Sequence, residues 1–351
     1  MGALYHNSSG VSSNNTNEIE AKALHIDTIK LSHAYKFHDL PPPQELKVKD
    51  FEINTKERNS NSIITAHLKS NKFNPFYLIV IKSGSGYCGI IIELSIAKLL
   101  DGNGLEIQTD EDIEAAFDGI EYIINKNVGV DFNSRTAKIG RLDVNADFLV
   151  GEDRITSYIH SISNPTAKFI PATYADTTRQ FYNKSKKLLV YGKYEEVKKQ
   201  VKEGKATLDD LEAAKGLLRF EVSMRKSPIS RLAQKLKVPA EASHLINLSV
   251  ASQIISEGLH QLDLDRPKLS KKLLYAKLLN HFGDKAPAML GIIKWHEVYG
   301  DNFWKDLGWS PSTYYRNRNK LMAANLWNIA PVEALPSLTL PDTYNNSTSL
   351  P

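Results

Sequence analysis

Two segments that alternate polar and apolar residues constrain the fold more than any other feature of this sequence. They are Lys138–Leu149 (KIGRLDVNADFL) and Leu217–Met224 (LLRFEVSM). Successive side chains of a β-strand point to opposite faces. The polar residues of the first segment would therefore share one face: Arg141, Asp143, Asn145 and Asp147. In the second segment the polar face would carry Arg219, Glu221 and Ser223. The pattern predicts a sheet with one polar, acid-bearing face.

Weaker signals surround these two strands. Phe76–Lys82 and Tyr87–Leu94 are apolar runs joined by a Ser/Gly turn, which is typical of a hairpin. Asp110–Asn125 is an amphipathic helix pattern with acids in its first turn. Further elements are expected as a strand at Thr177–Tyr182 and helices at Tyr194–Gly204 and Thr207–Ala214. This order predicts an α+β fold, with an antiparallel sheet and covering helices.

From Ile229 to Trp327 the spacing is helical almost throughout. Ser310 and Pro311 suit the start of a helix, and Ala286–Tyr299 would precede it in a helix-turn-helix-like unit. Arginine reads bases in a major groove, while tyrosine and lysine contact phosphates. We therefore predict DNA contacts from Tyr314, Arg316, Arg318 and Lys320. The alternative is an ordinary solvated helix with aromatic packing.

The length of 351 residues suggests about two domains. We expect a disordered arm at 1–20, a catalytic domain at 21–228, a helical DNA-binding domain at 229–330 and a disordered tail at 331–351. A single cysteine excludes an internal disulfide framework. The net charge of +4 permits nucleic-acid binding without requiring it. No segment is predicted to be a signal peptide or to cross a membrane.

Missing motifs narrow the chemistry. The sequence has no P-loop, no H-E-x-x-H, no C-x-x-C and no G-x-S-x-G. Its ten histidines are scattered, so a histidine-based metal site is not expected. Asp143 and Glu221 could instead converge on one divalent cation if their strands are neighbours, because hard oxygen ligands suit Mg²⁺ or Mn²⁺. The alternative, which spacing alone favours, is a solvated sheet face with cross-strand Arg–acid pairs.

Two tyrosines lie beside lysines, Tyr182 before Lys184 and Tyr191 before Lys193. A free phenol has a pKa near 10, so a neighbouring ammonium or metal would be needed to make it a usable nucleophile at neutral pH. A phosphotyrosyl bond conserves the energy of the phosphodiester, which makes strand cleavage reversible. Most tyrosines in strands do no chemistry, so both interpretations stay open at this point.

Four segments, in order, resemble the replication initiation proteins of filamentous phages, the gene II/X family. They are Tyr87–Gly104 (YCGIIIELSIAKLLDGNG), Ile139–Phe148 (IGRLDVNADF), Thr178–Leu188 (TRQFYNKSKKL) and Gly216–Arg225 (GLLRFEVSMR). The resemblance spans about 73–239, and extends more weakly into the C-terminal helices. It implies a replication-initiator nickase-like fold. It also implies rolling-circle replication, in which the protein nicks one strand at the origin, joins its 5′ end through tyrosine and later rejoins it.

The resemblance also assigns roles. Tyr182 corresponds to the nucleophile, although Lys187 replaces the acid of the family motif, and Tyr191 is the rival. Lys184 would assist the phenol or hold the scissile phosphate. The implied metal ligands for Mg²⁺ or Mn²⁺ are Asp143 and Glu221, then Glu93 and Asp147. Basic residues nearby are predicted to contact DNA: Arg141, Arg179, Lys186, Lys187 and Arg219.

The resulting hypothesis is a metal-dependent, tyrosine-nucleophile DNA nickase and strand transferase that acts on double- and single-stranded origin DNA. The family implies the cytoplasm of a bacterial host, with host helicase, polymerase and single-strand-binding protein as partners. Two alternatives remain, a non-catalytic DNA-binding regulator and a relaxase or transposase of the same chemical type.

Overall fold

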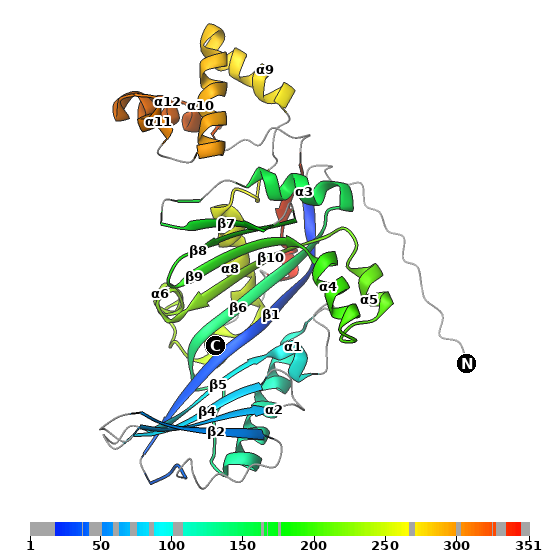
Figure 1. Cartoon of the computed structure of the whole chain (residues 1–351), viewed down its shortest axis with the longest axis vertical. Helices are drawn as coiled ribbons and strands as arrows, with labels where there is room; N and C mark the ends of the chain where they lie inside the picture. Colours follow the sequence, from blue (N-terminus) through cyan, green and yellow to red (C-terminus); the bar gives the residue numbers. More distant parts are fainter. Residues whose placement is uncertain are drawn as a thin grey trace, which may run out of the picture.

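A large, mostly antiparallel sheet organises the computed structural model (Figure 1). The structure describes residues 18–36, 38–41, 51–58, 63–70, 76–83, 88–100, 108–162, 165–166, 168–174, 177–266, 271–299, 303–324, 326–327 and 335–344. The strands follow the order β2-β3-β4-β5-β1-β6-β10-β9-β8-β7, and β11 pairs with β1. Along this path every neighbouring pair is antiparallel. The α+β prediction is confirmed.

The predicted strands occur close to their expected bounds. β6 is Lys138–Leu149, β10 is Leu217–Arg225, and the hairpin is β4 (Phe76–Ser83) with β5 (Cys88–Ser95). The predicted strand at Thr177–Tyr182 is β8 (Thr178–Tyr182). The remaining strands are β1 (Glu18–Tyr35), β2 (Phe51–Arg58), β3 (Ile63–Ser70), β7 (Ile170–Tyr174), β9 (Lys186–Gly192) and β11 (Ser337–Thr339).

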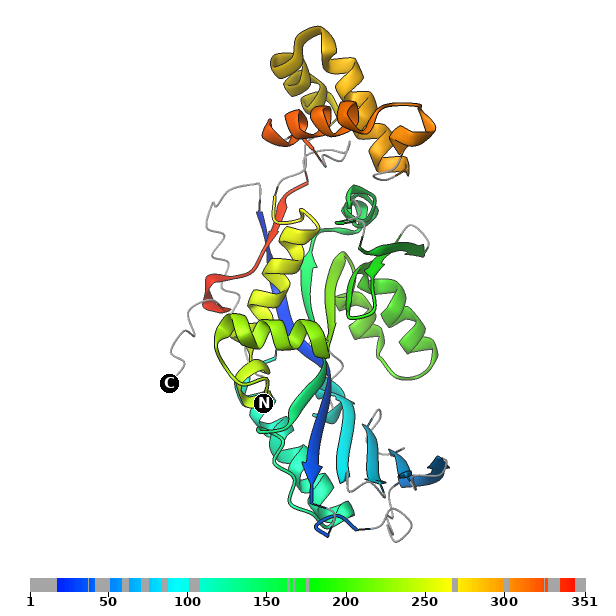
Figure 2. The same cartoon turned by 90° about the vertical axis from the view of Figure 1, so that its left-hand side faces the viewer.

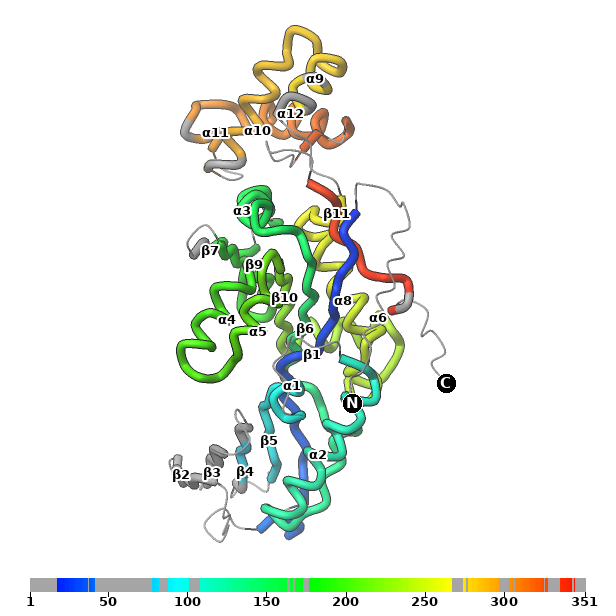
Figure 3. Tube along the Cα trace, turned by 90° about the vertical axis from the view of Figure 1, so that its right-hand side faces the viewer, coloured from blue at the N-terminus to red at the C-terminus, as the bar shows by residue number. Residues whose placement is uncertain are grey.

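Helices cover both faces of the sheet (Figures 2 and 3). One layer contains α2 (Asp110–Val128), α6 (Lys226–Leu236), α7 (Ala242–Leu245) and α8 (Leu248–Gln261). The other side carries α4 (Lys193–Lys202) and α5 (Leu208–Ala213). Two short helices complete the region, α1 (Ile96–Leu99) and α3 (Glu152–Ser161). The helix predicted at 110–125 is therefore α2, and its N-cap is Thr109, whose side chain accepts from the Asp112 amide.

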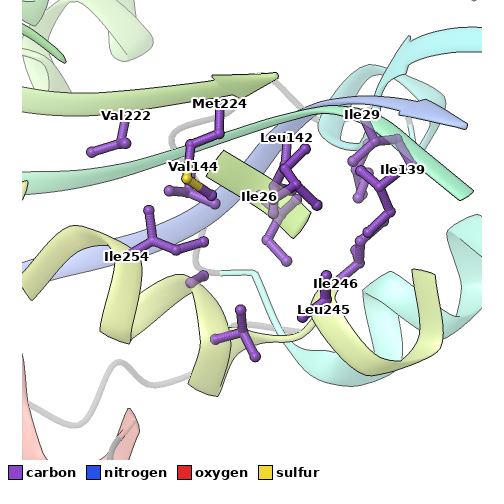
Figure 4. Close-up of a cluster of buried hydrophobic side chains, with 14 of the residues drawn as sticks. Ile26, Ile29, Ile139, Leu142, Val144, Val222, Met224, Leu245, Ile246 and Ile254 are labelled. Carbon is purple, nitrogen blue, oxygen red and sulfur yellow. The ribbon is translucent and has the colours of Figure 1, made fainter. Parts of the chain in front are cut away.

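The apolar face of the central strands packs on α7 and α8. Leu142 and Val144 of β6, with Val222 of β10, point toward Ile254 of α8 (Figure 4). α8 approaches so closely that a Cβ on Gly258 would lie 2.7 Å from the ring of Phe220. The helical domain was predicted to begin at 229, and in this structure apolar residues from Ile229 to Leu264 belong to the main core. The apolar sheet face has to be covered, and α6 to α8 supply that cover.

A second, smaller core lies in the C-terminal helices α9 (Lys271–Phe282), α10 (Ala286–Tyr299), α11 (Phe303–Asp306) and α12 (Pro311–Ala323). Its buried residues include Leu278, Ile292, Tyr314 and Leu321. Ser310 is the N-cap of α12, as predicted, because its side chain accepts from the Thr313 amide.

Parts of the two predicted disordered ends are ordered. β1 already begins at Glu18, inside the predicted arm. β11, inside the predicted tail, pairs in parallel with the start of β1. The Leu338 amide donates to the Leu264 carbonyl at 2.8 Å, and Leu338 is fully buried. Apolar Leu335 and Leu338 joining the main core explain why this stretch is structured despite its polar neighbours.

No helix within the described ranges is long and apolar enough to cross a membrane. The one cysteine, Cys88, is a free thiol buried in the main core.

Candidate active site on the polar face of the sheet

The polar face predicted for β6 and β10 exists, and the two strands are direct neighbours. In the register, Arg219 opposes Asp147, Glu221 opposes Asn145, and Ser223 opposes Asp143. The face is not solvated as the simpler interpretation expects, because Asp143 and Asp147 are only 2% and 1% exposed. The charges of its acids must therefore be balanced by cations of the protein itself. The cross-strand register places the polar residues of this face in three rows.

The first row, called the covered row below, consists of Tyr191, Arg219 and Asp147 on β9, β10 and β6. Arg219 donates to both carboxylate oxygens of Asp147, at 2.6 Å from Nε and 2.5 Å from Nη2. Both side chains are buried, and α4 lies over this end of β10. The pair is a buried, bidentate ion pair, so Asp147 is held as a structural carboxylate in this structure.

Tyr191 is tied down in the covered row. Part of its side chain reaches the surface, but its hydroxyl donates to Glu196 of α4. Burial raises the pKa of Tyr191 well above 10, although Arg219 opposes this rise. Glu196 also accepts from Lys193 at 2.9 Å. A phenol held in its neutral form by burial is poorly suited to act as a nucleophile.

The second row, called the open row below, consists of Tyr182, Lys187, Ser223 and Asp143 on β8, β9, β10 and β6. Neighbouring strands lie about 4.8 Å apart, so the backbones of Tyr182 and Asp143, three strands apart, are separated by roughly 14 Å across the sheet. A cavity of about 250 Å³ opens over this row. Its lining includes residues from four strands and the turn after β8: Arg141, Gln180, Tyr182, Asn183, Ser185, Lys186, Lys187, Ser223 and Arg225.

The acids of the open row lie behind the cations that line this cavity. Arg141 donates to both oxygens of Asp143, at 3.0 Å from Nε and 2.6 Å from Nη2. Asp143 also accepts from the Ser223 hydroxyl. Arg141 reaches Glu93 at 2.6 Å, and Glu93 also pairs with Lys30 at 3.1 Å. The cavity wall is therefore cationic, with carboxylates in its second layer.

Glu221 lies between the two rows. Its carboxylate pairs with Lys187 at 2.8 Å. Burial raises the pKa of Glu221, the Lys187 ammonium opposes that rise, and the nearby Asp143 adds to it. The charge of Asp143 thus reaches Glu221, which places the two predicted metal ligands in one neighbourhood.

A middle row joins His25 of β1, Asn145 of β6 and Glu221 of β10. His25 Nε2 and Asn145 Oδ1 are buried and have no hydrogen-bond partner. Together with the carboxylates of Asp143 and Glu221, they are donor types that suit a divalent cation. Within the described ranges, however, no three or more His, Cys, Asp or Glu residues are arranged as a metal site. Cation binding would require the carboxylates to exchange Arg141 and Lys187 for the metal.

The other predicted DNA contacts are divided among several environments. Arg141 and Lys187 line the cavity, and Lys184 is exposed at the adjoining turn. Arg219 is sealed in the covered row. Arg179 opposes apolar Val190, which places it on the opposite sheet face from Tyr182. Lys186 also belongs to that opposite face, since it opposes Met224.

In the C-terminal helices the predicted contacts also divide. Tyr314, which was predicted to contact phosphate, is fully buried in this structure, with its ring 5.2 Å from that of Phe303. The helical core needs this ring, because it packs edge-on against Trp327 and stacks on Trp304. Arg318 lies over the Trp327 ring at 5.4 Å. Arg316 and Lys320 are exposed.

Sequence reasoning missed His25, Gln180 and Arg225 as residues of this region. β1 is long, and only its period-two alternation after residue 20 could have indicated that His25 faces the same way as Asn145. The apolar run Leu188–Tyr191 could have indicated the strand β9. This segment was instead interpreted as part of a basic run.

A comparison with family models gives a match over residues 49–256, to the model described as replication-associated protein G2P, N-terminal. No curated protein sequence matches the chain. The matched range contains every strand of the open row, β6, β8, β9 and β10, and ends inside α8.

Proposed function

Because this match spans more than half of the chain, the protein belongs to the G2P family of replication initiators, and we propose that its open row nicks and rejoins one DNA strand. The family implies initiation of rolling-circle replication. The step proposed here is attack by the Tyr182 hydroxyl on a phosphodiester lying in the cavity of about 250 Å³.

In this step the Tyr182 oxygen forms a bond to phosphorus and the bond from phosphorus to the 3′ oxygen breaks. The phenolic proton leaves to solvent, which reaches the 37% exposed side chain, and the 3′ oxygen is protonated to a free 3′-OH. The products are a 5′-phosphotyrosyl link and a primer end. Attack by a 3′-OH on this link reverses the step and closes the strand.

The cations around the cavity carry the electrostatic part of the proposal. Lys187 opposes Tyr182 in the register, and Arg141 and Arg225 line the same cavity. Fixed donors aimed at a phosphoryl group stabilise the charge that develops in the transition state. Lys184, exposed at the adjoining turn, would contact the DNA strand there. The single observation that carries the proposal is that Tyr182 lines the same cavity as three cations. They are Arg141, Lys187 and Arg225.

We assign Asp143 and Glu221 as the residues that would hold Mg²⁺ or Mn²⁺, with Glu93 as a further carboxylate nearby. When bound, the metal would polarise the phosphodiester. Asp147 is the least suitable of the predicted ligands, since it is committed to Arg219. Asp143→Ala and Glu221→Ala are expected to lose nicking in Mg²⁺, while normal nicking by both would contradict the assignment.

The proposal is tested with supercoiled origin DNA and Mg²⁺. We expect an open circle with protein covalently attached. Tyr182→Phe should abolish that product while DNA binding persists, and Tyr191→Phe is the matched control that should still nick. Loss of nicking in Tyr191→Phe, with full activity in Tyr182→Phe, would transfer the role to the covered row.

The C-terminal helices are proposed to bind origin DNA through α12, in a helix-turn-helix-like manner. Arg316 and Lys320 are the exposed cations that support this. Each cation that neutralises a phosphate contributes nearly one unit to the slope of log K against log salt. Arg316→Ala and Lys320→Ala are therefore each expected to flatten that slope by about one unit.

One observation favours a second candidate, a DNA-binding regulator without nicking activity. Asp143 and Glu221 are each neutralised by a cation of the protein itself. If the wild-type protein binds origin DNA but gives no covalent product with either Mg²⁺ or Mn²⁺, this second function replaces the first.

A further inference from the structure

A second cavity, of about 310 Å³, lies on the other side of the turn between β8 and β9. It is bounded by α6 and α8, on the sheet face that these two helices cover. Two residues of the turn, Asn183 and Ser185, and the first residue of β9, Lys186, line both cavities. A chain leaving the Tyr182 cavity across this turn would therefore enter the second cavity directly.

The turn that separates the two cavities is held firmly. The Asn183 side-chain oxygen accepts from the amides of Ser185 and Lys186, both at 2.9 Å. The Ser185 carbonyl accepts from the Arg225 amide at 2.9 Å, just before α6 begins. Because these contacts fix the turn against β10 and α6, the two cavities keep a constant spacing.

The second cavity has an excess of cations. Lys186, Arg231 and Lys235 line it, together with one acid, Glu257. Glu257 is already paired with Lys235. Lys186 donates to the neutral amide oxygen of Gln261 at 3.1 Å, and Arg231 donates to the Ser227 hydroxyl at 3.1 Å. Neither of these contacts supplies a negative charge. The Glu257 carboxylate acts on Lys186 as well as on Lys235, but three cations face this one acid, so the cavity keeps a net positive charge that suits a phosphate.

Part of the remaining wall is apolar and includes Phe169, Met224 and Leu232, while Asn183, Ser185 and Gln261 add polar groups. An aromatic and aliphatic wall beside phosphate-binding cations is the combination that binds single-stranded nucleic acid, because every base has a face that stacks. A volume of about 310 Å³ is at the small end of ligand pockets. It suits one nucleoside and is far too small for a duplex.

We propose that this second cavity binds one unpaired nucleotide next to the scissile phosphate, with its base against Phe169 and its phosphate between Lys186 and Arg231. The inference rests on the proposed function, since it places the scissile phosphate at Tyr182. It implies that the origin strand is unpaired on at least one side of the cleavage position before the phosphodiester reaches the tyrosine.

The test measures binding of single-stranded origin oligonucleotides by fluorescence anisotropy, with the full-length Tyr182→Phe protein so that no cleavage occurs. A series of oligonucleotides lacks one base at a time around the cleavage position. We expect a single position, directly 5′ or 3′ of the scissile phosphate, where base loss weakens binding about tenfold. Adding Phe169→Leu should weaken binding of the intact oligonucleotide and have no effect on the one lacking that base.

Arg231→Gln should weaken binding of every oligonucleotide in the series and flatten the salt slope by about one unit. Lys199→Ala is the matched control, since this exposed cation lies on α4, away from the cavity, and it should leave both quantities unchanged. Thermal unfolding confirms that each variant is folded.

The inference is overturned if Phe169→Leu weakens binding equally whether or not any one base is present, or if Arg231→Gln behaves like Lys199→Ala. The proposed function can fail separately. If the oligonucleotide series shows the expected dependence on one base, but the wild-type protein gives no covalent product, the nucleotide subsite stands and the nicking proposal fails. Nicking without base coupling removes only the subsite.

Discussion

The covered row and the open row share one face of one sheet and have similar chemistry, yet they provide very different environments. Each contains a tyrosine, a cation and an aspartate in cross-strand register. In the covered row the cation and the acid form a buried pair under α4, and the phenol is tied to Glu196. In the open row the tyrosine and the cations line a cavity. The same residue types can therefore form either a structural ion pair or a candidate active site, depending on whether a helix covers them.

The difference originates in the segment that comes directly after each strand. β9 runs straight into α4, whose first residue, Lys193, is buried, so the helix closes over that end of β10. β8 ends instead in the short turn at 183–185, and β10 ends where α6 turns onto the opposite face. Nothing within the described ranges covers the open row in the same way. Three sets of substitutions test this contrast.

The largest effect is expected where a buried ion pair loses one partner. Asp147→Asn leaves the buried guanidinium of Arg219 without its carboxylate, which should lower the free energy of unfolding by about 3–5 kcal/mol. Asp143→Asn is the matched change in the open row. Its partner Arg141 keeps Glu93 and is partly solvated, so the loss should be about 1–2 kcal/mol. Urea unfolding measures both, and equal losses would contradict the distinction between the rows.

The middle row predicts a pH dependence of stability. Burial, and then the Arg219 charge, lower the pKa of His25 from 6.5 to about 4. Between these values the unfolded chain binds a proton that the folded protein does not. The free energy of unfolding should therefore fall as pH falls from about 6.5 to 4, by about 3 kcal/mol in all.

Urea unfolding at pH 7 and pH 4.5, in the presence of a chelator, measures this loss. His25→Gln lacks the titrating group, so its stability should depend less on pH over the same interval. An unchanged pH dependence in the variant would show that other groups are responsible.

The smallest effect separates the two tyrosines without any DNA. Tyr191→Phe removes the hydrogen bond to Glu196 and should cost about 1 kcal/mol. Tyr182→Phe removes a hydroxyl that faces the cavity, and should change stability by less than about 0.5 kcal/mol. Thermal unfolding of the two variants side by side makes the comparison. A larger loss for Tyr182→Phe would mean that its hydroxyl has a structural role.

Sequence reasoning found the strands whose period is clear. β6 has its predicted bounds, and the shared face of Arg141, Asp143, Asn145 and Asp147 follows from the alternation alone. It favoured Tyr182 over Tyr191 only through the family resemblance, because the difference in their surroundings depends on α4 folding over a strand that the pattern did not reveal. Sequence reasoning also predicted that Tyr314 contacts DNA. Helical spacing does not show which face of this helix packs into the second, smaller core.

The start and the end of the C-terminal helical region are joined at one point of the sheet. Leu264, just before this region, and Leu338, just after it, share a hydrogen bond, and the hydroxyl of Tyr158 donates to the Pro336 carbonyl alongside. The α9–α12 region is thus anchored to the main sheet at both of its ends, near Leu264 and near Leu338. A region anchored at both ends in this way stays close to the main sheet. Under the proposed function, residues 335–340, which lie well beyond α12, would therefore help to set the distance between DNA bound at α12 and the phosphodiester at Tyr182.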